Sequence, residues 1–201
     1  LVNYLGGVVI RFFNSSKEKE FIRRTFSQFV AKEVVDEIIK DPEKANLGGR
    51  NEHITALFSD IKSFSSFSEL VTPEQLVNIL NEYLGALSDN ILEHSGTIDK
   101  YIGDSIVSLF GAPIRIENHA YAACAAAIRM KQTEGEFNRN HMLTGDVPRE
   151  LYTRIGINTG DMIVGNMGTS LKKNYTMMGD NVNLASRLEG VNKVYGTWIL
   201  C

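Results

Sequence analysis

The sequence has few cysteines, no dense run of positive charge and no long apolar segment. Its two cysteines, Cys124 and Cys201, lie far apart and form no CxxC or Cys/His spacing, which is typical of a reduced, cytosolic setting. The net charge is -3, and no basic stripe indicates a nucleic-acid partner. No stretch reaches the roughly 18 apolar residues that a membrane span requires. With 43% hydrophobic and 22% charged residues, the composition is that of a globular protein.

The first 13 residues are almost wholly apolar and carry no charge before Arg11. A secretory signal would begin with a positive region, which is absent here. We expect residues 1–13 to be the cytoplasmic end of a transmembrane helix. A buried strand or helix of the domain itself is the alternative, because so short a run is ambiguous.

Residues 14–50 read as a linker that precedes the main domain. Apolar residues recur at helical spacing over 15–40, which predicts an amphipathic helix. Residues 41–50 contain Pro42 and the Gly48-Gly49 pair, which predict a loop. We therefore place the main domain at 51–201.

The main domain reads as alternating strands and helices. A helix is expected from Pro73, because Thr72, Pro73 and Gln75 form a strong N-terminal signature. The other predicted elements are a strand over 54–61, a hairpin over 97–111, a helix over 117–139, a two-strand unit over 152–160 and 161–168, a helix over 181–192 and a terminal strand over 195–201. This order predicts an α+β fold: a ferredoxin-like βαββαβ core with added strands, preceded by an amphipathic helix.

Two aspartates occupy positions suited to a ligand. Asp60 ends an apolar strand, and Asp104 lies in the turn of the next hairpin. If these strands are neighbours, both carboxylates point to one spot and suit Mg²⁺, which also accepts phosphate oxygens. As alternatives, Asp60 could be a helix cap and Asp104 a turn residue. The serine-containing loop after Asp60 could bind phosphate through backbone N–H groups.

Asn183 and Arg187 are four residues apart and share one face of the last predicted helix. An amide beside a guanidinium suits a sugar oxygen and a phosphate. A solvated helix face is the alternative interpretation of this pair.

Four motifs occur in order: ALFSDIKSFSSFSE, DKYIGDSIVSLFG, RIGINTGDMIVGNMG and NYTMMGDNVNLASRLE. Together they resemble the catalytic domain of the class III adenylate and guanylate cyclases, over about residues 53–201. The N-terminal segment is similar to the membrane-exit and linker helix of bacterial receptor-type members, which favours the membrane interpretation of residues 1–13. The resemblance thus implies a cytoplasmic domain of an inner or plasma membrane protein.

The resemblance assigns roles position by position. It implies catalytic roles for Asn183 and Arg187, metal binding by Asp60, Ile61 and Asp104, and substrate binding by Lys100, Thr176, Arg154, Phe64 and Ser65. Two Mg²⁺ or Mn²⁺ ions per site would assist attack of the ribose 3′-oxygen on the α-phosphate of ATP, with pyrophosphate leaving. In this family two protomers pair head to tail and share each site. One chain here carries both sets of residues, so a homodimer is implied.

Lys100 and Thr176 favour adenine. A lysine only donates, which suits N1, and a threonine hydroxyl can accept from N6. Guanylate cyclases of this family typically have Glu and Cys or Ser at these two positions. The expected product is therefore 3′,5′-cyclic AMP.

The sequence departs from the family pattern at several positions, with milder variations at Lys62 and Asn181. Ser63 stands where the family usually has glycine in the phosphate loop. The chain also stops at Cys201, whereas the family continues with further elements that carry a lysine in contact with the triphosphate, so we expect a truncated domain with low or no activity. The alternative function is a catalytically silent regulatory or dimerisation module.

Overall fold

The computed structural model describes residue 20, residues 31–40 and residues 46–201. The chain divides into two units, Leu1–Asn46 and Leu47–Cys201. In the first unit, helix α2 (Lys32–Lys40) falls within the helix predicted over 15–40. The predicted transmembrane end at 1–13 lies outside the described residues and stays a prediction. Among the helices that are described, none is both long and apolar enough to cross a membrane.

The second unit is built on one six-stranded sheet. Its strands are β1 (Gly48–Ile61), β2 (Gly96–Ile102), β3 (Ser105–Phe110), β4 (Thr153–Gly168), β5 (Lys173–Met178) and β6 (Ile199–Leu200). The sheet order is β2-β3-β1-β4-β5, with every neighbour antiparallel, and β6 pairs in parallel with the start of β4. Long helices join β1 to β2 and β3 to β4. This arrangement confirms the predicted ferredoxin-like βαββαβ core with added strands.

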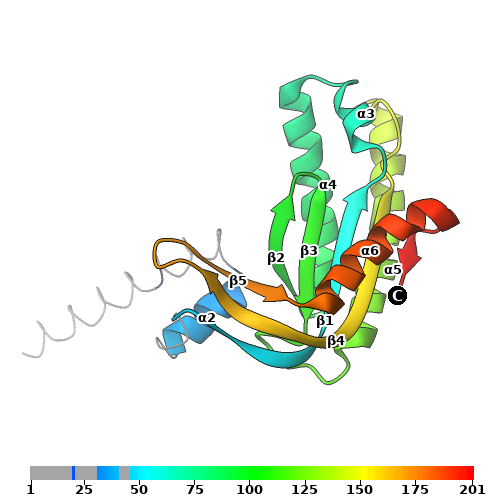
Figure 1. Ribbon diagram of the computed structural model, residues 1–201. Coiled ribbons are helices and arrows are strands. Elements are labelled where there is room, and N and C mark those ends of the chain that lie inside the picture. Colours follow the sequence, from blue (N-terminus) through cyan, green and yellow to red (C-terminus); the bar gives the residue numbers. More distant parts are fainter. Residues whose placement is uncertain (1–19, 21–30, 41–45) are drawn as a thin grey trace, which may run out of the picture. The chain divides into compact units, whose positions relative to one another are not determined.

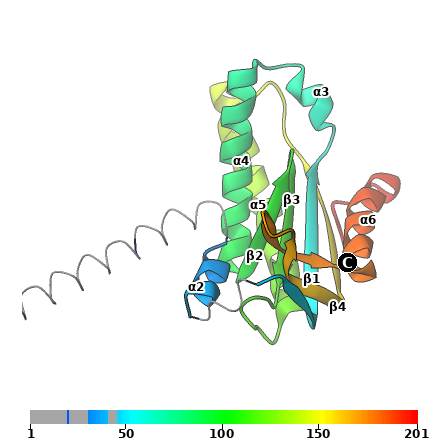
Figure 2. The same ribbon diagram turned by 60° about the vertical axis from the view of Figure 1, so that its left-hand side comes forward.

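Helices cover both faces of the sheet (Figures 1 and 2). Helices α4 (Pro73–Glu93) and α5 (His119–Thr144) pack against Leu57, Ile106 and Ile155. Helix α6 (Asp180–Tyr195) packs on the other face, where Val182 and Ala185 join a second apolar cluster that includes Ala56 and Val107. A short helix, α3 (Phe64–Ser68), follows β1. Because side chains alternate along a strand, Asp60 shares the face of Ala56 and lies on the α6 side.

The start of α4 confirms the predicted capping box. The Gln75 backbone N–H donates to Thr72 Oγ1 at 3.3 Å, and the Thr72 backbone N–H donates to Gln75 Oε1 at 2.9 Å. Pro73 takes the first helical position, where no backbone N–H is needed.

The predicted two-strand unit over 152–160 and 161–168 is wrong. Residues Thr153–Gly168 form one continuous strand, β4, which pairs with β1 along the whole length of β1. Gly160 and Asp161 resemble a turn in sequence, but Gly160 lies within the ladder opposite Ile54. A Cβ on Gly160 would come within 2.5 Å of the Asn181 side chain. The glycine therefore makes room for the start of α6 and does not turn the chain.

Several element ends also differ from prediction. Strand β1 begins at Gly48, inside the predicted loop, because it pairs with β4 there. Helix α5 continues to Thr144, and α6 continues to Tyr195, into the predicted terminal strand. In each case the following glycine, Gly145 or Gly196, has a left-handed conformation that ends the helix.

Candidate active site

The structure brings Asp60 and Asp104 together, as the sequence predicts. Asp60 lies near the end of β1, and Asp104 lies in the turn between β2 and β3, where Gly103 has a φ of +62°. Ser105 Oγ donates to Asp60 Oδ1 at 2.8 Å, and the Ile61 backbone N–H donates to Asp104 Oδ2 at 3.1 Å. Burial, and next the charge of Asp60, raise the pKa of Asp104. Two carboxylates of like charge thus share one spot.

Arg154 joins this pair from the neighbouring strand. It stands opposite Asp60 in the β1–β4 register, and its Nη2 lies 2.9 Å from Asp60 Oδ2. On its other side, Arg154 Nε lies 3.0 Å from Glu189 Oε1 of α6. Burial, and next the charge of Asp60, raise the pKa of Glu189, while Arg154 lowers it. One guanidinium therefore lies between carboxylates from the sheet and from α6.

Glu189 was not predicted from the sequence. The predicted face of α6 carries Asn183 and Arg187, and both of these side chains are exposed. Glu189 comes two residues after Arg187 and so lies on a different side of the helix, toward Arg154. Glu189 follows the buried Val182 and Ala185 at helical spacing. An acidic residue at such a position was the available sequence signal.

The carboxylate pair fits a divalent cation. Asp60 and Asp104 supply hard oxygen donors. Burial, and next the charge of Asp60, raise the pKa of Asp104, and a cation bound between the two carboxylates would oppose this shift. Among the described residues, no three His, Cys, Asp or Glu side chains lie close enough together to hold a metal ion without other ligands. Mg²⁺ commonly needs only one or two carboxylates when phosphate oxygens complete its shell. The Ile61 backbone N–H lies beside Asp104, but a donor cannot bind a cation, so metal binding by Ile61 stays a prediction.

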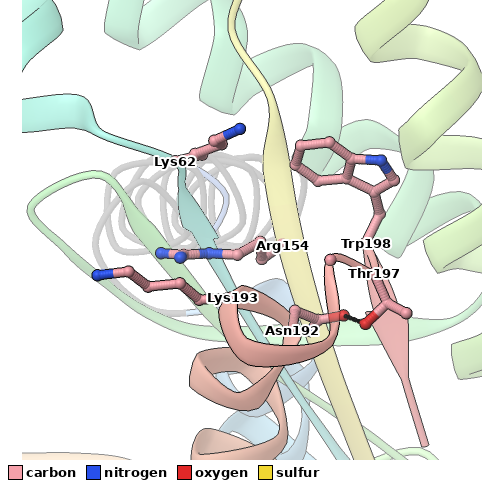
Figure 3. Close-up of a pocket in the computed structure, with 7 residues that line it drawn as sticks. Lys62, Arg154, Asn192, Lys193, Thr197 and Trp198 are labelled. Atoms are coloured by element: carbon pink, nitrogen blue, oxygen red, sulfur yellow. Dashed lines mark hydrogen bonds between the residues drawn. The ribbon is translucent and has the colours of Figure 1, made fainter.

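A pocket of about 160 Å³ lies beside Arg154. It is lined by Lys62, Arg154, Asn192, Lys193, Gly196, Thr197 and Trp198. Figure 3 shows the cationic side chains of Lys62, Arg154 and Lys193 one below another, with Trp198 to their right. The Asn192 amide is used internally, since its Nδ2 donates to Ile155 O and its Oδ1 accepts from Thr197 Oγ1. Lys62 and Lys193 add positive charge beside Arg154, whose own charge is shared with Asp60 and Glu189, and this lining suits an anion such as phosphate.

The loop after β1 borders the same region. Arg149 Nη2 donates to the Ser63 carbonyl oxygen at 2.7 Å, which fixes the loop from the segment before β4. Ser63 has φ +56° and ψ +38°, a left-handed conformation that favours glycine. Of the predicted substrate residues, Phe64 packs partly buried against the core and Ser65 is exposed in α3.

Lys100 and Thr176 form a second cluster. Lys100 lies on β2 and Thr176 on β5, the first and last strands of the order β2-β3-β1-β4-β5. The sheet curls so that β2 and β5 approach each other, and Lys100 Nζ donates to Thr176 Oγ1 at 3.2 Å. Thr176 Oγ1 in turn donates to Asp99 Oδ2 at 2.6 Å. Burial raises the pKa of Asp99, while Thr176 and Lys100 lower it. The structure thus brings the two predicted base-reading residues into contact and adds Asp99, which was not predicted from the sequence.

Asn183 and Arg187 lie apart from the carboxylate cluster. Both are exposed on α6, while Val182 and Ala185 of the same helix are buried against the sheet. The contacts described for Asp60, Asp104 and Arg154 come from β1, β3, β4 and Glu189, and none comes from these two residues. The predicted site residues therefore fall into three groups on one chain.

Comparisons with known proteins agree with this geometry. Residues 48–195 match the sequence model of the family described as the adenylate and guanylate cyclase catalytic domain. "Adenylate cyclase 1" of Rhizobium meliloti is 41% identical over 179 residues; the match covers 88% of this chain but only 26% of that relative. The chain thus spans about a quarter of that relative's length.

Solved structures of cyclases show the same fold. The crystal structure of the guanylyl cyclase Cya2 is 40% identical, with a TM-score of 0.67 and 72% of each chain covered. The adenylyl cyclase CyaB from P. aeruginosa is 37% identical, with a TM-score of 0.68 and coverage of 72% of this chain and 74% of that one. Similarity to cyclases named for either base is nearly equal. The chain belongs to the adenylate and guanylate cyclase catalytic domain family.

Proposed function

We propose that this domain is an adenylate cyclase, which converts ATP to 3′,5′-cyclic AMP and pyrophosphate at the interface of a homodimer. The contact between Lys100 Nζ and Thr176 Oγ1, at 3.2 Å, carries the choice of base. Lys100 can only donate, which suits N1 of adenine, and the Thr176 oxygen can accept from the 6-amino group. Guanine carries a hydrogen at N1 and an oxygen at C6, and so would leave both contacts unmade.

The phosphate end of ATP would lie against Arg154 and the basic pocket. Asp60 and Asp104 would hold Mg²⁺ or Mn²⁺, two ions per site, beside it. When bound, the metal activates the 3′-oxygen and neutralises charge on the phosphates. Arg154 binds phosphate oxygens, and Lys62 and Lys193 add positive charge around the pocket.

A dimer supplies the remaining groups. Asn183 and Arg187 are exposed on α6 and lie apart from the carboxylates of their own chain. In a head-to-tail homodimer they would face the partner's Asp60 cluster, where they would position the ribose and stabilise charge on the transferring phosphate. Two equivalent sites would result from the symmetry.

The test is an assay of cyclic nucleotide formation from ATP and from GTP with Mg²⁺ or Mn²⁺. We expect cyclic AMP from ATP and a strong preference over GTP. The double variant K100E/T176C should reverse the preference, because a carboxylate can accept from the guanine N1–H. Absence of cyclic AMP in a protein that binds ATP would instead favour a silent regulatory or dimerisation module.

A further inference from the structure

Asp99 is a buried carboxylate that contacts both base-reading residues. Its side chain is only 2% exposed. Its Oδ2 accepts from Thr176 Oγ1 at 2.6 Å, and its Oδ1 lies 3.4 Å from Lys100 Nζ. Oδ1 has no hydrogen bond of good geometry. Burying a carboxylate is unfavourable unless it is paired and hydrogen-bonded.

The hydroxyl of Thr176 has one proton and two lone pairs. The proton is directed to Asp99, and one lone pair receives an N–H of Lys100 at 3.2 Å. One lone pair therefore remains for a ligand. In this arrangement Thr176 is an acceptor and has no proton left to donate.

We propose that Asp99 is a positioning residue that sets the preference for adenine by holding the proton of Thr176. The hydroxyl then accepts from the 6-amino group of adenine, and it cannot donate to the 6-oxo group of guanine. An oxygen facing this lone pair would find no donor on Thr176, which is unfavourable. The inference rests on the proposed adenylate cyclase function and adds a third residue to the control of base choice.

A simpler role for Asp99 is to neutralise Lys100. The geometry favours the proposed role, because the contact with Thr176 is the shorter one and Oδ1 makes only a long contact with Lys100. The two roles differ in what the D99N variant would do. An asparagine would turn its oxygen toward Lys100 and its N–H groups toward Thr176, which would free the threonine proton.

The first experiment measures kcat/KM for ATP and GTP in the full chain and in Asp99→Asn. We expect the ATP:GTP ratio to fall about tenfold in the variant. In the Thr176→Val background, Asp99→Asn should leave the ratio unchanged, because Asp99 acts through the hydroxyl. Asp146→Asn is the matched control, since Asp146 also accepts from a threonine hydroxyl, that of Thr144, but at an exposed site. An unchanged ratio, or an equal fall in the Thr176→Val background, would overturn the inference.

A second experiment uses the unaltered protein and so does not depend on whether a variant folds. N6-methyl-ATP keeps one N–H donor at C6, while 6-methoxypurine riboside triphosphate has a similar bulk, an unprotonated N1 and only an acceptor at C6. We expect the N6-methyl compound to be used at least about tenfold better. Equal use of the two compounds would overturn the role of Asp99 while leaving the proposed function intact. Failure of ATP itself to react would instead count against the proposed function.

Discussion

Arg154 stands directly opposite Asp60 on the neighbouring strand, and their charged groups lie 2.9 Å apart. The same guanidinium contacts Glu189 of α6 at 3.0 Å. It therefore balances acidic groups that would otherwise repel one another. In the proposed function a metal and a phosphate both bind here. The stability of the fold and the chemistry of the site would then both depend on the Arg154 guanidinium.

Replacing Arg154 by alanine should destabilise the protein. The side chain is 15% exposed, and its loss would leave Asp60 and Glu189 close together without a counter-charge. We expect a loss of about 2 kcal/mol in the free energy of unfolding, since breaking a largely buried pair is unfavourable. Denaturant unfolding measures this loss, and Mn²⁺ should partly restore stability. Arg154→Ala combined with Glu189→Gln should lose less than Arg154→Ala alone.

The control is Arg115→Ala, whose side chain is 81% exposed and pairs with Glu52. Its effect should stay within about 0.5 kcal/mol. Equal effects of the two alanine variants would show that Arg154 does not balance a cluster of carboxylates.

Replacing Asp104 by asparagine should separate stability from activity. Burial and Asp60 raise the pKa of Asp104 in the folded protein, so the fold favours its protonated form. The stability that this proton provides is complete below the unfolded pKa and is lost as the pH rises through the raised folded pKa. At neutral pH, in metal-free protein, Asp104→Asn should therefore unfold at the same or a higher temperature.

The same variant should lose at least about 100-fold in turnover, because a metal ligand contributes several kcal/mol of charge stabilisation. Thermal unfolding with and without Mn²⁺, beside the cyclic AMP assay, measures both effects. Asp89→Asn, at an exposed position of α4, should change neither. A variant that keeps full activity or loses its stability at neutral pH would contradict the metal assignment.

The sequence predicted local structure better than long-range contacts. Thr72 and Gln75 act within four residues, and the turn at Gly103 depends on its neighbours alone. The contact of Lys100 with Thr176 spans 76 residues and depends on the curl of the sheet, which no local pattern encodes. Before the structure, only the family resemblance indicated that these two residues belong to one site.

The missed residues share one property. Asp99 and Glu189 are carboxylates whose partners lie on other elements. Asp99 directly precedes the predicted base-reading Lys100, and Glu189 lies two residues after the predicted catalytic Arg187. The wrong turn at Gly160 has a similar cause, because the need for glycine there comes from α6 and not from its own strand. Tertiary packing explains all three, and only for Glu189 did the helix pattern carry a signal of it.

Replacing Gly156 by alanine should displace α6. A Cβ at this position would lie 2.2 Å from the Glu189 backbone nitrogen and 2.3 Å from the Ala185 carbonyl oxygen. Backbone atoms cannot move aside as a flexible side chain can, so the helix must shift away from β4. We expect a loss of about 3 kcal/mol in unfolding free energy, at the upper end for overpacking, together with most of the activity.

Gly85→Ala is the matched control for this substitution. Gly85 lies in α4, and a Cβ there would meet no atom within 4 Å. Alanine should stabilise the helix by about 0.5–1 kcal/mol. If Gly156→Ala were equally harmless, the close packing of α6 on β4 would be wrong.

Ser63 offers a substitution that should improve the fold. Its φ of +56° places a side chain in the left-handed region, which is unfavourable by about 1–2 kcal/mol for most residues. The Ser63 side chain makes no capping hydrogen bond to α3, so glycine would lose no such contact. Part of the gain is offset because glycine gives the unfolded chain more freedom. We expect Ser63→Gly to raise the free energy of unfolding by up to about 1 kcal/mol.

Ser66→Gly provides the opposite case within the same short segment. Ser66 lies inside helix α3 and is exposed, so glycine should destabilise it by about 0.5–1 kcal/mol through backbone freedom alone. Urea unfolding of the two variants measures the difference in sign. Ser63→Gly should also lower the KM for ATP, because the loop could approach phosphate more closely without the side chain. If both variants lost stability equally, the left-handed conformation at Ser63 would not be a source of strain, and the loop would have to adopt another backbone path in solution.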